Sequence, residues 1–152
     1  MKKKFIYFFV LIMMPLCMMQ MISAYSEEVQ LSEIYDALMK QRIDVWNYIY
    51  NEDFSYDKFI EEMNKIETEV LLEEDVREFK TMKESPVDMA KVELIGYKEK
   101  SIKRIKSGYE IELLMNWQIE DLDYNYEESS MVKIDIIKVK DKWLLSKWEN
   151  IE

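Results

Sequence analysis

The spacing of the apolar residues changes at Pro86, and this change limits the chain to folds in which helices precede strands. Before Pro86, apolar residues recur every three or four positions, as in helices that pack on one face. After it, apolar and polar residues alternate, as in strands with one buried and one solvated face. The order predicts an α+β fold, in which N-terminal helices pack on one antiparallel sheet.

The clearest strand is "YEIELLMNWQIE", residues 109–120, in which every second residue from Tyr109 to Ile119 is apolar. Strands are also predicted in 88–106, 131–139 and 143–151. The apolar phase of the first of these shifts at Gly96, which indicates a bulge or bend. Ser107-Gly108 predicts one hairpin turn, and "KDK" before Trp143 a second tight connection. The strands are expected to form a curved four-stranded antiparallel β-meander.

Three helices are expected before the sheet. Ser26 is a candidate cap for a helix that runs to Asn51. A second helix is predicted to start near Ser55, and a third to stop before Pro86, because the residue preceding a proline avoids helical geometry. A bend is expected within 68–74, between an apolar stripe of Tyr56, Phe59, Met63, Ile66 and Val70 and a second stripe of Leu72, Val76, Phe79 and Met82.

This order of elements resembles the NTF2-like (cystatin-like) superfamily. The residues that carry the resemblance lie in the last hairpin and strand: Val139, Asp141, Trp143, Leu145 and Trp148. The resemblance implies a single domain over 27–152. The superfamily usually places a strand between its helices, and the sequence has no clear one there. Exported bacterial members, many of them uncharacterised, include parts of envelope and conjugation assemblies, but a fold does not fix a function.

Residues 1–24 have the build of a signal peptide. Three lysines precede an uncharged run from Phe5 to Met19, and small residues follow near Ala24. An uncleaved membrane anchor is the alternative, because the apolar stretch approaches the length that spans a bilayer. A lipoprotein anchor at Cys17 is disfavoured, since Pro15 and Leu16 stand where small residues are wanted. The protein is therefore expected to be exported, and secreted or extracytoplasmic at the cell envelope.

Composition excludes several kinds of chemistry. The formal charge is −10, and removal of the leader with its three lysines makes it −13, which disfavours nucleic acid as a partner. Histidine is absent, and the single cysteine lies in the leader. Triads with histidine and the usual zinc sites are thereby excluded, as are phosphate loops, because the chain has only two glycines. No cofactor is expected.

Asp121, Asp123 and Asn125 have the spacing of the first three ligands of a calcium loop. Such a loop also needs glycine at its sixth position and glutamate at its twelfth. Tyr126 and Val132 stand there instead. We therefore expect a solvated hairpin tip and no metal site, with these three residues as a weak calcium candidate.

Arg42 is the most unusual residue of the first helix, because helical spacing places it within the apolar stripe. A guanidinium there must find carboxylates, carbonyls or water. One hypothesis places Arg42 in a pocket between helix and sheet, with Tyr35, Trp46 and Trp117 as walls. The alternative is that Arg42 reaches the edge of the core or pairs with a strand acid such as Asp135.

Two functions follow from these patterns. The first is a non-enzymatic domain that binds a protein partner or a small ligand at the envelope. The second is an isomerase or cyclase with Asp135 as general base and Tyr35 or Tyr109 as hydrogen-bond donor, and it requires an open cavity that holds a carboxylate. Self-association through the outer sheet face is a third possibility.

Overall fold

The computed structural model describes residues 30–48, 55–84, 91–120 and 124–151. The chain divides into two compact units, Met1–Asp36 and Ala37–Glu152. Of the first unit, residues 30–36 are described and are helical, and the predicted leader lies outside the described residues. No helix in the described part of the chain is long and apolar enough to cross a membrane. The packing described below is that of the second unit.

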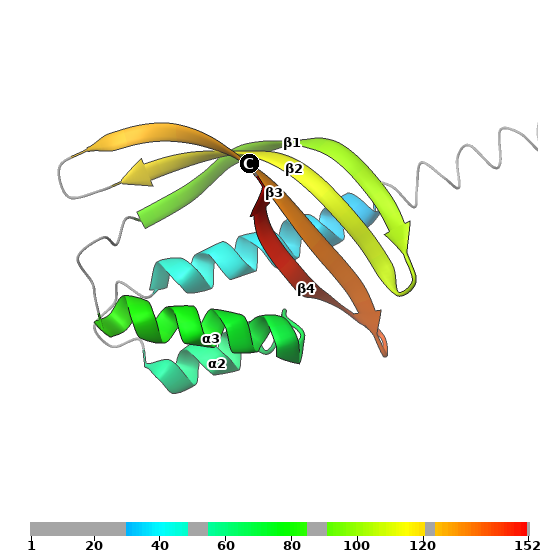
Figure 1. Ribbon diagram of the computed structural model, residues 1–152, viewed down its shortest axis with the longest axis horizontal. Coiled ribbons are helices and arrows are strands. Elements are labelled where there is room, and N and C mark those ends of the chain that lie inside the picture. Colours follow the sequence, from blue (N-terminus) through cyan, green and yellow to red (C-terminus); the bar gives the residue numbers. More distant parts are fainter. Residues whose placement is uncertain (1–29, 49–54, 85–90, 121–123, 152) are drawn as a thin grey trace, which may run out of the picture. The chain divides into compact units, whose positions relative to one another are not determined.

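Three helical segments precede the strands in this unit. Residues 37–47 are helical, and α2 (Tyr56–Met63) and α3 (Glu69–Glu84) follow. The predicted start of α2 is confirmed: Ser55 is its cap, and the Ser55 hydroxyl accepts a hydrogen bond of 3.3 Å from the backbone N–H of Lys58. α2 and α3 lie on the same side of the sheet (Figure 1).

The predicted position of the break between the second and third helices is wrong. α2 ends at Met63, and the intervening chain makes one parallel bridge, between Glu67 and Leu145. Thr68 N donates to Leu145 O at 2.8 Å, and Leu145 N donates to Ile66 O at 2.8 Å. In the described part of this segment, the pairing with the sheet is limited to this bridge, which satisfies peptide groups at an edge of the sheet.

The apolar face of α3 also differs from the prediction. Val70 was expected on the buried stripe but is 66% exposed, because the new helix starts at Glu69 with its own phase. The buried positions are Leu71, Asp75 and Phe79, which are spaced four residues apart on one helical face. An acidic residue therefore occupies the middle of the buried stripe.

Four antiparallel strands form one sheet in the order β1-β2-β3-β4. Their register shifts between Leu94 and Gly96, which confirms the predicted irregularity at that glycine. The first hairpin turn is at Lys106-Ser107, one residue before its predicted place. The predicted α+β meander is thereby confirmed (Figure 1). The strands are β1 (Lys91–Ile105), β2 (Gly108–Glu120), β3 (Asn125–Val139) and β4 (Lys142–Ile151).

Alternate residues of the two central strands form the core. Full burial of such an aliphatic side chain contributes about 1.5–3 kcal/mol. The opposite face carries cross-strand ion pairs, of which Lys133–Glu112, at 3.4 Å, is one. Each such surface pair contributes at most about 1 kcal/mol. Most of the stability of the sheet therefore comes from burial of its apolar face. The buried strand residues are Ile111, Leu113, Met115, Val132, Ile134, Ile136 and Leu145.

Gly108 starts β2 where two backbones approach closely. A Cβ on Gly108 would lie 1.8 Å from the backbone oxygen of Ile136, whereas a Cβ on Gly96 would meet nothing within 4 Å. We predict that Gly108→Ala lowers the free energy of unfolding by about 1–3 kcal/mol, because β3 must move. Gly96→Ala, the control, should stay within about 0.5 kcal/mol of wild type. Urea denaturation measures both, and equal stabilities would contradict this account.

Candidate functional site

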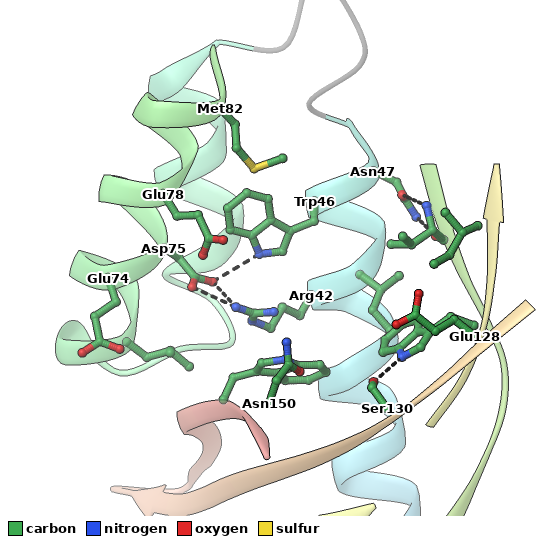
Figure 2. A pocket seen from close by; sticks show the side chains of 16 residues that line it. Arg42, Trp46, Asn47, Glu74, Asp75, Glu78, Met82, Glu128, Ser130 and Asn150 are labelled. Carbon is green, nitrogen blue, oxygen red and sulfur yellow. Dashed lines mark hydrogen bonds and ion pairs between the residues drawn. The ribbon is translucent and has the colours of Figure 1, made fainter. Parts of the chain in front are cut away.

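A cavity of about 540 Å³ lies between the helices and the sheet. This volume is in the range of small-molecule sites, roughly 300–1,000 Å³. Of the seven helical and strand segments described, all except α2 contribute to its wall (Figure 2). The lining residues are Arg42, Ile43, Trp46, Asn47, Leu71, Glu74, Asp75, Glu78, Met82, Val92, Trp117, Ile119, Glu128, Ser130, Trp148 and Asn150.

Helical spacing explains which helix residues face the cavity. In the first helix, Arg42 and Trp46 are one turn apart, and each is followed by a further lining residue. In α3 the lining residues Leu71, Asp75 and Glu78 also repeat at intervals of three or four. Each helix therefore presents one continuous face to the cavity.

Each strand of the sheet contributes residues near one of its ends to the cavity wall. On β2, Trp117 and Ile119 follow the buried row and are half-buried. Trp117 lies opposite Glu128 in the β2–β3 register. The indole N–H of Trp117 donates to Ser130 Oγ at 2.8 Å, which fixes the orientation of the ring (Figure 2).

Asn47 attaches the helix to the free edge of β1. Its Nδ2 donates to Val92 O at 2.6 Å, and its Oδ1 accepts from Val92 N at 3.1 Å. An amide side chain can pair with both groups of a peptide, as a neighbouring strand would. This contact fixes the cavity wall at β1.

Arg42 is 9% exposed and binds two carboxyl groups. Its Nε donates to Glu67 Oε1 at 3.0 Å, and its NH2 donates to the two carboxyl oxygens of Asp75 at 2.8 and 2.7 Å. Trp46 Nε1 also donates to Asp75 Oδ2, at 3.3 Å. The guanidinium carbon lies 4.5 Å from the ring centroid of Trp148 and 5.9 Å from that of Trp46. The charge of Arg42 is therefore compensated within the wall.

Glu67 is the second carboxyl group of this cluster, and its side chain is fully buried. Burial raises its pKa to about 8, and the neighbouring charge of Asp75 acts in the same direction. The charge of Arg42 lowers this pKa but does not offset the other two effects. Its second oxygen, Oε2, is buried without a hydrogen-bond partner among the described residues. Glu67 therefore binds its proton more tightly than an exposed glutamate does.

The structure brings together three of the four predicted pocket residues: Arg42, Trp46 and Trp117 line one cavity. Tyr35 is 1% exposed, lies in the first unit and is not among the lining residues. The carboxyl partners of Arg42 are Glu67 and Asp75. The alternative pairing of Arg42 with Asp135 is not found.

Asp135 lies outside the cavity. It alternates with the buried Ile134 and Ile136 and pairs in register with Lys147, on the other face of the sheet. Burial raises its pKa, as does the charge of Glu110, and both effects are opposed by Lys147 and Lys133. The other alternative catalytic residue, Tyr109, stacks near Trp143, with centroids 5.9 Å apart, and does not line the cavity. The catalytic role of either residue stays a prediction.

The candidate calcium residues Asp121 and Asp123 lie outside the described residues. Asn125 begins β3, and its side chain accepts a hydrogen bond from Gln118. Among the residues that the structure describes, no group of three or more acidic, histidine or cysteine side chains has the arrangement of a metal site.

Sequence reasoning missed Glu67 and Asp75. Asp75 had a usable signal, because it lies four residues from both Leu71 and Phe79 within an apolar stripe. The same signal singled out Arg42. Glu67 had no such signal, since its position depends on the bridge to Leu145, which is distant in sequence.

We predict that the stability of the protein falls as the pH rises from 4.5 to about 8, through the raised pKa of Glu67. In this range the folded protein keeps a proton that the unfolded chain releases, so unfolding becomes easier by up to roughly 1.4 kcal/mol per pH unit. Glu67→Gln cannot ionise and should flatten this dependence and raise the stability at pH 8.

Urea denaturation at several pH values measures the effect. Glu73→Gln is the matched control, because Glu73 is an exposed residue of α3. It should keep the wild-type dependence. Parallel curves for Glu67→Gln and the wild type across this range would contradict the prediction.

No protein-family model matches the sequence, and no curated protein matches it. Solved structures do match. The intermembrane space region of the chloroplast protein ARC6 is 13% identical, with a TM-score of 0.49, and the match covers 74% of this chain and 94% of that one. The NTF2-like potential transfer protein TraM from the Gram-positive conjugative plasmid pIP501 is 14% identical, with a TM-score of 0.46 and coverages of 80% and 97%.

An NTF2-like protein of unknown function from Shewanella oneidensis MR-1 is 13% identical, with a TM-score of 0.49, and the match covers 80% of this chain and 98% of that one. At these identities the likeness concerns the arrangement of helices and strands alone. The predicted order of elements is confirmed, since helices come first and an open four-stranded antiparallel sheet follows, and the solved structures that this chain resembles include NTF2-like proteins.

Proposed function

We propose that this protein is an exported, non-enzymatic domain that binds a protein partner or a small ligand in the cavity between its helices and sheet. The observation that carries the proposal is the cavity itself. It is open, it has the volume of a ligand site, and three tryptophans line it: Trp46, Trp117 and Trp148.

The tryptophans are held in place before any ligand arrives. The indole N–H of Trp46 donates to Asp75, and that of Trp117 donates to Ser130. Trp148 lies against the guanidinium of Arg42. Rings that are already ordered lose little conformational entropy on binding, which favours affinity.

The enzymatic alternative has one observation in its favour, because the cavity is open and holds carboxyl groups. An isomerase or cyclase needs one of them free to take a proton. Asp75 accepts hydrogen bonds from both Arg42 and Trp46. Asp135, the predicted base, lies on the other face of the sheet. Neither Asp75 nor the predicted base Asp135 is therefore a free carboxyl group inside the cavity.

Export is the second part of the proposal, and it rests on the leader-like residues 1–24. We expect the mature protein to begin shortly after Ala24 and to occur outside the cytoplasm. N-terminal sequencing of the protein from fractionated cells measures both. A chain that starts at Met1 in the membrane fraction would support the anchor instead, and a cytoplasmic chain would contradict export.

Ligand binding is tested by filling the cavity. Asn150 lines its mouth from β4, whereas the adjacent Glu149 points to the other face, where it pairs with Lys147. We predict that Asn150→Trp weakens binding at least about tenfold because it occupies ligand volume. Glu149→Trp, the control, should bind like wild type.

The measurement is a fragment library screened by ¹H–¹⁵N NMR, in which the indole signals of Trp46 and Trp117 report occupancy of the cavity. Trp143, which does not line the cavity, is the internal reference. A diverse library that leaves the cavity indoles unchanged would overturn the proposal. So would fragments that bind Asn150→Trp as tightly as wild type.

A further inference from the structure

The wall of the cavity carries more acidic than basic groups. Glu74 and Glu78 of α3 and Glu128 of β3 line it together with Asp75, while Arg42 is its one basic lining residue in the described part of the chain. No hydrogen bond or ion pair joins the side chains of Glu74, Glu78 or Glu128 to another described residue. Clefts lined by one sign of charge concentrate ions of the other sign.

Arg42 does not offset this charge. Its guanidinium donates to the carboxyl groups of both Glu67 and Asp75. Its positive charge is therefore compensated within the buried cluster, and little of it faces the cavity, because the residue is only 9% exposed. The three remaining glutamates set the potential that an entering ligand meets.

The aromatic residues of the wall favour the same sign of ligand. The face of a tryptophan ring attracts cations. The protein's own cation already makes this contact, since the guanidinium carbon of Arg42 lies 4.5 Å from the centroid of Trp148. Trp117 is half-buried, lies directly opposite Glu128 in the register and has its N–H satisfied by Ser130. This register pair places an indole and a carboxyl group side by side in the wall.

We propose that the cavity binds an organic cation: an ammonium or guanidinium group carried on an apolar body, with the charge beside Glu128 and the apolar part against Trp117. This inference rests on the proposed binding function and adds the chemical class of the ligand. The cation is either the basic side chain of a protein partner or a free small amine, and both present the same chemistry.

Three probes share a phenyl group and differ in charge: benzylammonium, benzyl alcohol and benzoate. They test whether the cavity prefers a cation. The shifts of the Trp46 and Trp117 indole signals on titration into the exported domain give the affinities. We expect benzylammonium to bind at least about tenfold more tightly than the other two. The difference should shrink at high salt, because exposed charges are then screened.

Matched variants test the residues. Glu128→Gln should weaken benzylammonium about fivefold or more and leave benzyl alcohol unchanged. Glu127→Gln is the control, since Glu127 is the preceding residue of β3 and does not line the cavity. Trp117→Leu should weaken benzylammonium roughly 2- to 30-fold. Glu128→Gln keeps the test valid should Trp117→Leu fail to fold.

Two peptides test whether the cation comes from a protein partner or from a small amine. One has a single arginine between glycines, and the other has glutamine in its place. Tighter binding of the arginine peptide than of benzylammonium indicates a protein partner, and the reverse indicates a small amine. If benzyl alcohol or benzoate binds as tightly as benzylammonium, the inference is wrong while the binding function stands. If all probes leave the cavity indoles unchanged, the inference is wrong, and the fragment screen decides the binding function separately.

Discussion

The buried contact of Arg42 with Glu67 and Asp75 is the interaction on which the arrangement of the helices depends. It joins the first helix to the segment before α3 and to α3 itself. Loss of Arg42 or Asp75 from such a buried cluster would cost about 3–5 kcal/mol, because an uncompensated charge would remain. The cluster has two acids for one base, and burial together with the neighbouring charge of Asp75 raises the pKa of Glu67.

The sheet is engaged at both of its edges by the helical part of the unit. Asn47 pairs with Val92 on β1, and the segment before α3 pairs with Leu145 on β4. Both contacts satisfy peptide groups that would otherwise be open to another chain. They also fix the helices over the same sheet face, so the cavity is bounded from two sides. The side chains at the positions that face the cavity then make its wall acidic and aromatic.

Local patterns in the sequence predicted most of the fold. The alternation through Ile111 and Trp117 identified β2 and its buried face, and Ser55 marked the start of α2, because these features depend on near neighbours in the chain. The break before α3 was misplaced, since its position is set by pairing with β4. For the same reason Glu67 was missed. Arg42 was recognised as unusual, but its partners come from chain segments that no periodicity relates to it.

The single bridge at Glu67 has a consequence for which ligands the cavity admits. Two backbone hydrogen bonds hold the start of α3 to the rim of the sheet, whereas β1 and β2 are paired along almost their entire length. Segments held by few bonds open at low free energy, and extensively paired ones do not. By backbone pairing alone, the α3 wall is therefore held less tightly than the sheet, and side-chain contacts such as Arg42 with Asp75 hold it in place. A bulky guest would be accommodated by a shift of the helix, and the acidic residues Glu74 and Glu78 would move with it.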